Sequence, residues 1–344
     1  MQVSNLVTRD GGGHSVSGSK KQDLNNSRGY QSGNKMFGSL GLFHGGINNP
    51  GGPFTGSNEY FNIGTGGSTL EWGDLPVSNL YDGGGVTNGA RAVEIGGQSH
   101  PGTGWGSGVD TIQWISIGKS GVGADFGEIS GNSGDLGYTE DGNRGVAAYG
   151  PYPFGGTDRQ MINIGTTSSA VDYGETTHNI TYGGSGACDG SRAIFAGGHG
   201  PSGPNHSTQM EYHAIQTSAT GADFGELTQA TRAGVAHSDG SRGIHAGGDA
   251  PGHPGPTGYS DTIAYFTIGT VASAIDYGDM SVGGQHGGMC SNGSRGVVAG
   301  LWGSGGSETG TDTLDMINIG ILGNAVDYGE LDISRGYSGD VSGD

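Results

Sequence analysis

The sequence is poor in the residues on which several large classes of protein depend. It has 14 Lys and Arg against 33 Asp and Glu, for a formal net charge of −19. A surface that binds nucleic acid or anionic lipid needs clustered cations, so neither partner is expected. No apolar run approaches the roughly 20 residues of a membrane span, and the start of the chain lacks the charged-then-apolar pattern of a signal peptide. Membrane insertion is therefore not expected.

Cysteine is also scarce, which limits disulfide and metal chemistry. Only Cys188 and Cys290 are present, and no CxxC spacing of a zinc or redox motif exists. The two residues precede matching turns that lie two units apart in an internal repeat. A disulfide needs Cα atoms about 6 Å apart, so both thiols are expected to be free and structural.

Glycine, by contrast, is abundant and periodic. It makes up 78 of 344 residues, about three times its usual share of roughly 7%. A phrase of acidic, aromatic, Gly and acidic residues recurs, as in "AVDYGEL" (325–331), and an apolar run ending in glycine recurs with it, as in "IFAGG" (194–198). Both markers have a period of about 51 residues. The chain is therefore six copies of one unit, at about 23–75, 76–129, 130–176, 177–227, 228–280 and 281–331.

Each unit has the pattern of four short β-strands and none of a helix. Asp-Gly and Asn-Gly pairs between the first two strands are strong hairpin signals. In the third strand, "DTIAYFTIG" (261–269), both alternating faces carry apolar residues, which predicts a strand covered on both sides. Four-stranded units of about 50 residues packed between neighbours describe the blades of an all-β propeller.

The two ends of the repeat bear on how the ring closes. "DLNNSRGYQSG" (23–33) is echoed by "ELDISRGYSGD" (330–340), so the unit's first strand occurs seven times. We expect six blades in a single propeller over residues 23–344, closed by a strand within 332–344, with residues 1–22 as an N-terminal arm that anchors the protein. A degenerate seventh blade is the alternative.

At this point the repeat resembles a known family. An Arg-led first strand, an Asp-Gly turn, a second strand ending in Gly-Gly and an aromatic near the fourth strand resemble the kelch repeat. The form "SRGVVAG…DTLDMINIG…NAVDYGEL" is similar to the Gly-rich kelch-like repeats of tail-fibre and other virion proteins of marine tailed phages. The resemblance covers roughly residues 23–340 and departs from kelch in its Asp-Tyr/Phe-Gly-Glu phrase, where only Trp72 keeps the usual Trp. It implies a propeller and a virion role, not an activity.

The acidic phrases are expected to be scaffolding. One basic residue per unit follows the Asp-Gly turn, and a repeated structural contact would pair it with the phrase. The predicted pairs take Arg144, Arg192, Arg242 and Arg295 with Asp125, Asp172, Asp223, Asp276 and Asp327. Calcium is the alternative, because carboxylates are hard oxygen ligands, although no EF-hand or glycine-nonapeptide spacing supports it. The aromatic is expected to wedge between blades, and its glycine to permit a bulge or a close backbone approach.

No catalytic set is evident. The eleven histidines form no HExxH or HxH motif. A copper radical oxidase would need a Cys near a Tyr plus two His ligands, and a sialidase-like propeller would need three clustered arginines, whereas the arginines here are spread one per unit. We therefore expect neither catalytic residues nor cofactors.

The connections between the second and third strands differ in every unit and are expected to emerge on one face. Binding residues tend to sit on such loops, although loop aromatics that cap the blade ends are an equal alternative. The candidate ligand-facing residues are Trp105, Tyr152, Phe154, His199, His206, His253, Tyr259 and Trp302.

These observations predict a non-enzymatic virion protein, of tail-fibre or surface-decoration type. It would be extracellular, on the virion surface, with other virion proteins and a host-surface glycan or receptor as partners, and homo-oligomerisation stays open. The alternatives are a secreted carbohydrate-active or oxidase-type propeller enzyme and a purely architectural protein–protein module.

Overall fold

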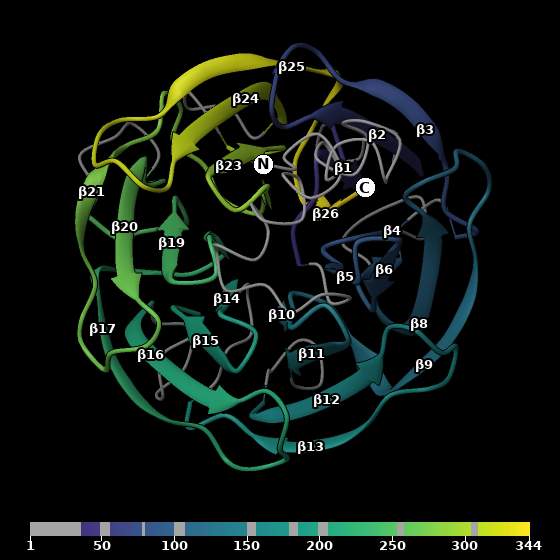
Figure 1. Ribbon diagram of the computed structural model, residues 1–344, viewed down its shortest axis with the longest axis horizontal. Helices are drawn as coiled ribbons and strands as arrows, with labels where there is room; N and C mark the ends of the chain where they lie inside the picture. Colours follow the sequence, from purple (N-terminus) through teal and green to yellow (C-terminus); the bar gives the residue numbers. More distant parts are fainter. Residues whose placement is uncertain are drawn as a thin grey trace, which may run out of the picture.

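The computed structural model describes residues 36–48, 56–77, 80–99, 107–149, 156–178, 185–198, 206–252, 258–303 and 309–344. The expected arm at 1–22 lies outside the described residues, as do Trp105, Tyr152, Phe154, His199 and His253. The described residues form an all-β ring of six antiparallel sheets around a central channel (Figure 1). The described residues include no helix that is long and apolar enough to cross a membrane.

Each sheet is one propeller blade, and its strands run from the channel outward. Blade 1 comprises β26 (Gly339–Gly343), β1 (Leu40–His44), β2 (Ser57–Asn62) and β3 (Leu70–Asp74). Blade 2 comprises β5 (Gly84–Thr87), β6 (Arg91–Ile95), β8 (Ser107–Ser116) and β9 (Ala124–Ser133), and the short β4 (Leu80–Tyr81) and β7 (Gln98–Ser99) extend it. Blade 3 comprises β10 (Gly137–Glu140), β11 (Arg144–Tyr149), β12 (Asp158–Asn163) and β13 (Val171–Glu175).

The other three blades repeat this order. Blade 4 comprises β14 (Ser185–Cys188), β15 (Arg192–Ala196), β16 (Ser207–Ala214) and β17 (Ala222–Thr231). Blade 5 comprises β18 (Val235–Ser238), β19 (Arg242–Ala246), β20 (Thr262–Thr267) and β21 (Ile275–Asp279). Blade 6 comprises β22 (Gly288–Ser291), β23 (Arg295–Ala299), β24 (Thr311–Asn318) and β25 (Val326–Arg335). The six innermost strands contact one another in sequence around the channel.

The ring closes by pairing the two ends of the described chain. β26 pairs antiparallel with β1, from Leu40 opposite Gly343 to His44 opposite Gly339. The last strand of the sequence is therefore the innermost strand of the first blade, and six blades complete the propeller. The prediction of six blades with a C-terminal clasp is confirmed.

The acidic–aromatic phrase is the junction between blades. Its glycine sits at a register shift in the outermost strand and has a positive φ, +145° in Gly278. The next blade's hairpin donates to the phrase's carbonyls, as Gly323 N does to Tyr277 O at 3.0 Å and Ala325 N to Asp279 O at 2.8 Å. The aromatic reaches across the same junction, since the Tyr173 hydroxyl donates to Ile215 O at 2.6 Å. The predicted wedge and close backbone approach are both confirmed.

The core lies between blades rather than in one central mass. One cluster joins blade 5 to blade 6 through residues such as Ile263, Met289 and Ile317, all fully buried. Third-strand residues on both faces are buried, as the doubly apolar pattern predicts. This packing leaves the loops at the two ends of the ring as the places where blades can differ.

Candidate functional site at the channel mouth

The two ends of the ring carry different kinds of connection between strands. Each innermost strand begins where the second strand ends, because the two are antiparallel neighbours. The variable loops therefore emerge beside the starts of the innermost strands, on what we call the loop face. The Asp-Gly turns and the hairpins between third and fourth strands lie at the opposite end, the turn face.

On the turn face, the predicted pairs between turn arginines and phrase acids do not form. Arg192 lies over the Tyr212 ring at 4.6 Å and donates to Ile268 O of the next blade at 3.0 Å. Arg242 likewise lies over Tyr265 and donates to Ile319 O. Arg295 donates to Gly64 O and to the Tyr328 hydroxyl. These arginines stack on aromatics and bridge to the next blade's backbone.

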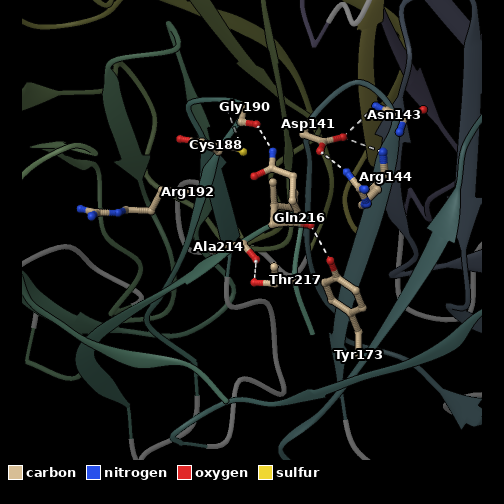
Figure 2. Close-up of polar contacts among 12 residues, drawn as sticks. Asp141, Asn143, Arg144, Tyr173, Cys188, Gly190, Arg192, Ala214, Gln216 and Thr217 are labelled. Atoms are coloured by element: carbon tan, nitrogen blue, oxygen red, sulfur yellow. Dashed lines mark hydrogen bonds and ion pairs between the residues drawn. The ribbon is translucent and has the colours of Figure 1, made fainter. Parts of the chain in front are cut away.

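Arg144 is held within its own turn. Its guanidinium lies 3.2 Å from the Asp141 carboxylate, and Figure 2 shows the two side chains in contact. The acids of the phrase are exposed, at Asp125, Asp172, Asp223, Asp276 and Asp327. The prediction fails because an arginine begins the second strand while its acid lies on the fourth. The whole third strand separates them, a span of roughly 10 Å at the usual strand spacing.

A different polar contact, which was not predicted from the sequence, repeats between blades. One buried polar side chain in the third strand accepts a backbone N–H from the end of the preceding blade's outermost strand. The acceptor–donor pairs are Glu59 with Asp332 at 2.9 Å, Gln113 with Val77 at 3.0 Å, Gln160 with Ser130 at 2.8 Å, Glu211 with Thr177 at 2.5 Å and Asp315 with Ser281 at 2.8 Å. The signal was a lone polar residue at a fixed place in an apolar strand.

On the loop face, a ring of backbone positions surrounds the channel mouth. Five equivalent non-glycine residues, each two positions before an innermost strand, have φ between +51° and +64°. These residues, which we call the channel mouth, are Asp82, Asp135, Ala233, His286 and Tyr337. Backbone bonds link four of them, from Asp82 N to Tyr337 O, Tyr337 N to His286 O and His286 N to Ala233 O. A left-handed conformation at a non-glycine residue costs about 1–3 kcal/mol, and such residues cluster at functional sites.

Three mouth side chains converge. His286 Nδ1 lies 2.8 Å from Asp82 Oδ1 and 3.9 Å from Asp135 Oδ1. Gln98 Nε2 donates to the other oxygen of each aspartate at 3.2 Å, and the Tyr81 hydroxyl donates to Gln98 Oε1 at 3.0 Å. The side chains of His286, Asp82 and Asp135 are 6%, 8% and 1% exposed. Two carboxylates and an imidazole thus face one another almost out of solvent.

Burial dominates the electrostatics of this cluster. It raises the pKa of Asp82 to about 6, since an ion loses hydration there. Burial and the neighbouring Asp82 charge raise the pKa of Asp135 well above its ordinary value. Burial lowers the pKa of His286 to about 4. Each group is therefore biased toward its neutral form.

Aromatic side chains support the cluster from one side. Tyr337 stacks on His286 with ring centroids 4.2 Å apart, and Trp302 packs on Tyr337 at 5.1 Å. Tyr81 meets Tyr337 edge-on. Trp302 is only 3% exposed, so the prediction that it faces a ligand is wrong. The alternative that a loop aromatic caps the blade ends holds for it, because packing on Tyr337 buries the indole.

The two other described loop candidates lie at the surface of this face. His206 Nε2 is 3.0 Å from Asp249 Oδ2, which also pairs with Arg232 at 2.8 Å. Tyr259 is half-buried and lies against Gly303, where a Cβ would meet its ring at 2.0 Å. The structure places both on the loop face and does not bring either to the aspartate–histidine cluster.

Two small cavities occupy the channel. One, of about 40 Å³, is lined by Asp82, Asp135, His286, Tyr138 and neighbouring residues. The other, of about 20 Å³, shares Tyr138, whose hydroxyl bonds Asp340 Oδ1 at 2.5 Å. Each has room for one or two waters. The small cavities show that the channel is narrow. Burial raises the pKa of Asp340 to about 6, so the acids that line the channel are biased toward protonation.

Comparisons with known proteins inform the fold only. No known protein family matches the sequence, and no curated protein matches it. Among solved structures, the chain is similar to the structure of YjhT, with a TM-score of 0.60 and 10% sequence identity over 84% of this chain and 97% of that one. The likeness shows the β-propeller fold.

Proposed function

We propose that this chain is a non-enzymatic binding protein that recognises its ligand with the loop face. The observation that carries the proposal is that the channel mouth combines one repeated backbone conformation with side chains that differ from blade to blade. Five equivalent positions keep the same strained backbone conformation, yet carry Asp, Asp, Ala, His and Tyr side chains. Structural contacts repeat from blade to blade, whereas a site for one ligand is asymmetric. The asymmetry of this face therefore favours recognition there.

The channel cavities are too small to enclose a ligand of ordinary size. They measure about 20 and 40 Å³, whereas pockets that enclose a small-molecule substrate run to roughly 300–1,000 Å³. A ligand of ordinary size would therefore contact the outer surface of the loop face. Half-buried Tyr259 and the His206–Asp249–Arg232 group offer an aromatic ring and polar groups that suit sugar hydroxyls.

The repeat's resemblance to virion proteins gives this binding a context. We propose a tail-fibre or surface-decoration protein on the outside of a virion. Its ligand would be a host-surface glycan or receptor, and other virion proteins would hold it in place. The net charge of −19 suits a solvent-exposed particle surface.

A glycan array with the purified chain tests the loop-face assignment. We expect binding that Tyr259→Ala or His206→Ala weakens at least tenfold. Val271→Ser, which changes an exposed residue on the turn face, should bind like the wild type. Absence of any glycan signal would overturn the glycan assignment. A Val271→Ser loss equal to that of Tyr259→Ala would overturn the loop face as the site.

A purely architectural role is the second candidate, and the turn face favours it. Eight exposed large apolar residues lie in the hairpins between third and fourth strands or at the first residue of a fourth strand. They are Leu70, Val122, Val171, Val271, Ile275, Ile321, Leu322 and Val326. Exposed apolar residues gathered on one side suit a protein contact. Light scattering of the wild type and of Val122→Ser with Ile321→Ser would show whether this face drives self-association.

A further inference from the structure

The cluster at the channel mouth has the ligand set of a metal site. One ligand atom each from Asp82, Asp135 and His286 lies within 4.8 Å of the others. Ligand atoms about 2.1 Å from a single ion stand roughly 3.0–3.5 Å apart. The Asp82–His286 distance of 2.8 Å and the Asp135–His286 distance of 3.9 Å bracket that range. Small side-chain movements would therefore bring all three atoms onto one ion.

One ligand atom in the cluster has only a distant partner, His286 Nδ1 at 3.9 Å. Asp135 Oδ1 is buried without a hydrogen bond, although its side chain is only 1% exposed. It is directed at His286, while Gln98 satisfies Asp135 Oδ2. A buried carboxylate oxygen without a partner is costly. A cation between Asp135 and His286 would satisfy it.

The surrounding structure fixes the orientation of these ligands. Gln98 bonds both aspartates and is itself held by Tyr81. Tyr337 stacks on the imidazole. Metal sites use such outer partners to orient their ligands. The three backbone positions bring residues of blades 2, 3 and 6 to one point.

We propose that Asp82, Asp135 and His286 bind one divalent transition-metal ion of the zinc type at the channel mouth. An imidazole ligand disfavours calcium and magnesium, which prefer oxygen ligands alone. Two carboxylate oxygens and one nitrogen suit Zn²⁺ and leave at least one position for water, and the adjoining cavity of about 40 Å³ has room for it. The ion would tie three blades together across the mouth.

The test is metal binding by the purified, chelator-treated full chain. We expect titration calorimetry with ZnCl₂ and elemental analysis after dialysis to give one ion per chain. CaCl₂ should bind at least a hundredfold more weakly. Asp135→Asn and His286→Gln should each weaken zinc binding at least tenfold. Asp340→Asn, which alters a buried acid deeper in the channel, is the matched control and should bind zinc like the wild type.

Each measurement has an outcome that would overturn the proposed metal site. Failure of the wild type to bind stoichiometric zinc would overturn the site, as would zinc binding unchanged in Asp135→Asn. An equal loss in Asp340→Asn would show adventitious binding elsewhere in the channel. Cobalt absorption spectra give a second readout, since the visible bands of a bound Co²⁺ should change in His286→Gln. Because these measurements read metal binding and not glycan binding, they stand apart from the loop-face proposal.

Discussion

The junction glycines offer a sharp test of how the blades are held at their spacing. Gly278 has φ +145°, and a Cβ there would lie 2.6 Å from the carbonyl carbon and oxygen of Gly323 in the next blade. Gly323 has φ +151° and faces open space. Gly278→Ala and Gly323→Ala therefore impose similar backbone strain, on the two sides of one junction, but only the first imposes a clash.

The expected loss of unfolding free energy in each variant follows from the backbone strain and the clash. The unfavourable backbone conformation costs about 1–3 kcal/mol in either variant. Forcing a methyl group against the neighbouring backbone adds about 1–3 kcal/mol in Gly278→Ala, because the hairpin of blade 6 must move outward. That movement also strains the 3.0 Å bond from Gly323 N to Tyr277 O.

Urea denaturation followed by far-ultraviolet circular dichroism measures the difference. Gly278→Ala should unfold at a lower midpoint than Gly323→Ala, with an unfolding free energy about 1–3 kcal/mol smaller. If the two variants agree to within about 0.5 kcal/mol, close approach of the backbones does not set the junction. The glycine requirement would then be conformational alone.

Three further outcomes are expected. Arg159 is fully buried and its guanidinium nitrogens have no hydrogen-bond partner, so Arg159→Met, which copies Met210 of blade 4, should raise the unfolding free energy by about 1–3 kcal/mol by removing these unsatisfied donors; a loss in urea denaturation would contradict this. Burial lowers the pKa of His245 to about 4, so this histidine should contribute a loss of stability of up to about 1.4 kcal/mol per pH unit as the pH falls from 6.5 to 4. His245→Phe should reduce that loss, and an unchanged slope would refute it. Deleting 339–344 removes β26, so Cys290, whose Sγ lies 3.2 Å from Val341 O, should react with a thiol reagent that leaves the intact protein unmodified; continued protection would show that the clasp does not cover it.

The channel mouth shows why the candidate site was not predicted. Asp82, Asp135 and His286 lie far apart in the sequence, and each stands in a short connection without a motif. Only the shared position, two residues before an innermost strand, relates them, and that position becomes visible once the strands are placed. Two of the loop residues predicted to face a ligand make contacts within the protein instead. Trp302 packs inside an aromatic cluster, and His206 pairs with Asp249.

The sequence by itself determined the repeat, the strand content, the propeller architecture and the use of glycine at each blade junction. Those features depend on local periodicity and on contacts made identically in every unit, so each of the six repeats carries the same sequence signal for them. Tertiary structure alone decided which side chains meet across blades. The arginines bind the neighbouring backbone because a strand separates them from the acids, and three unlike residues converge at the mouth because ring closure brings blades 2, 3 and 6 around one axis.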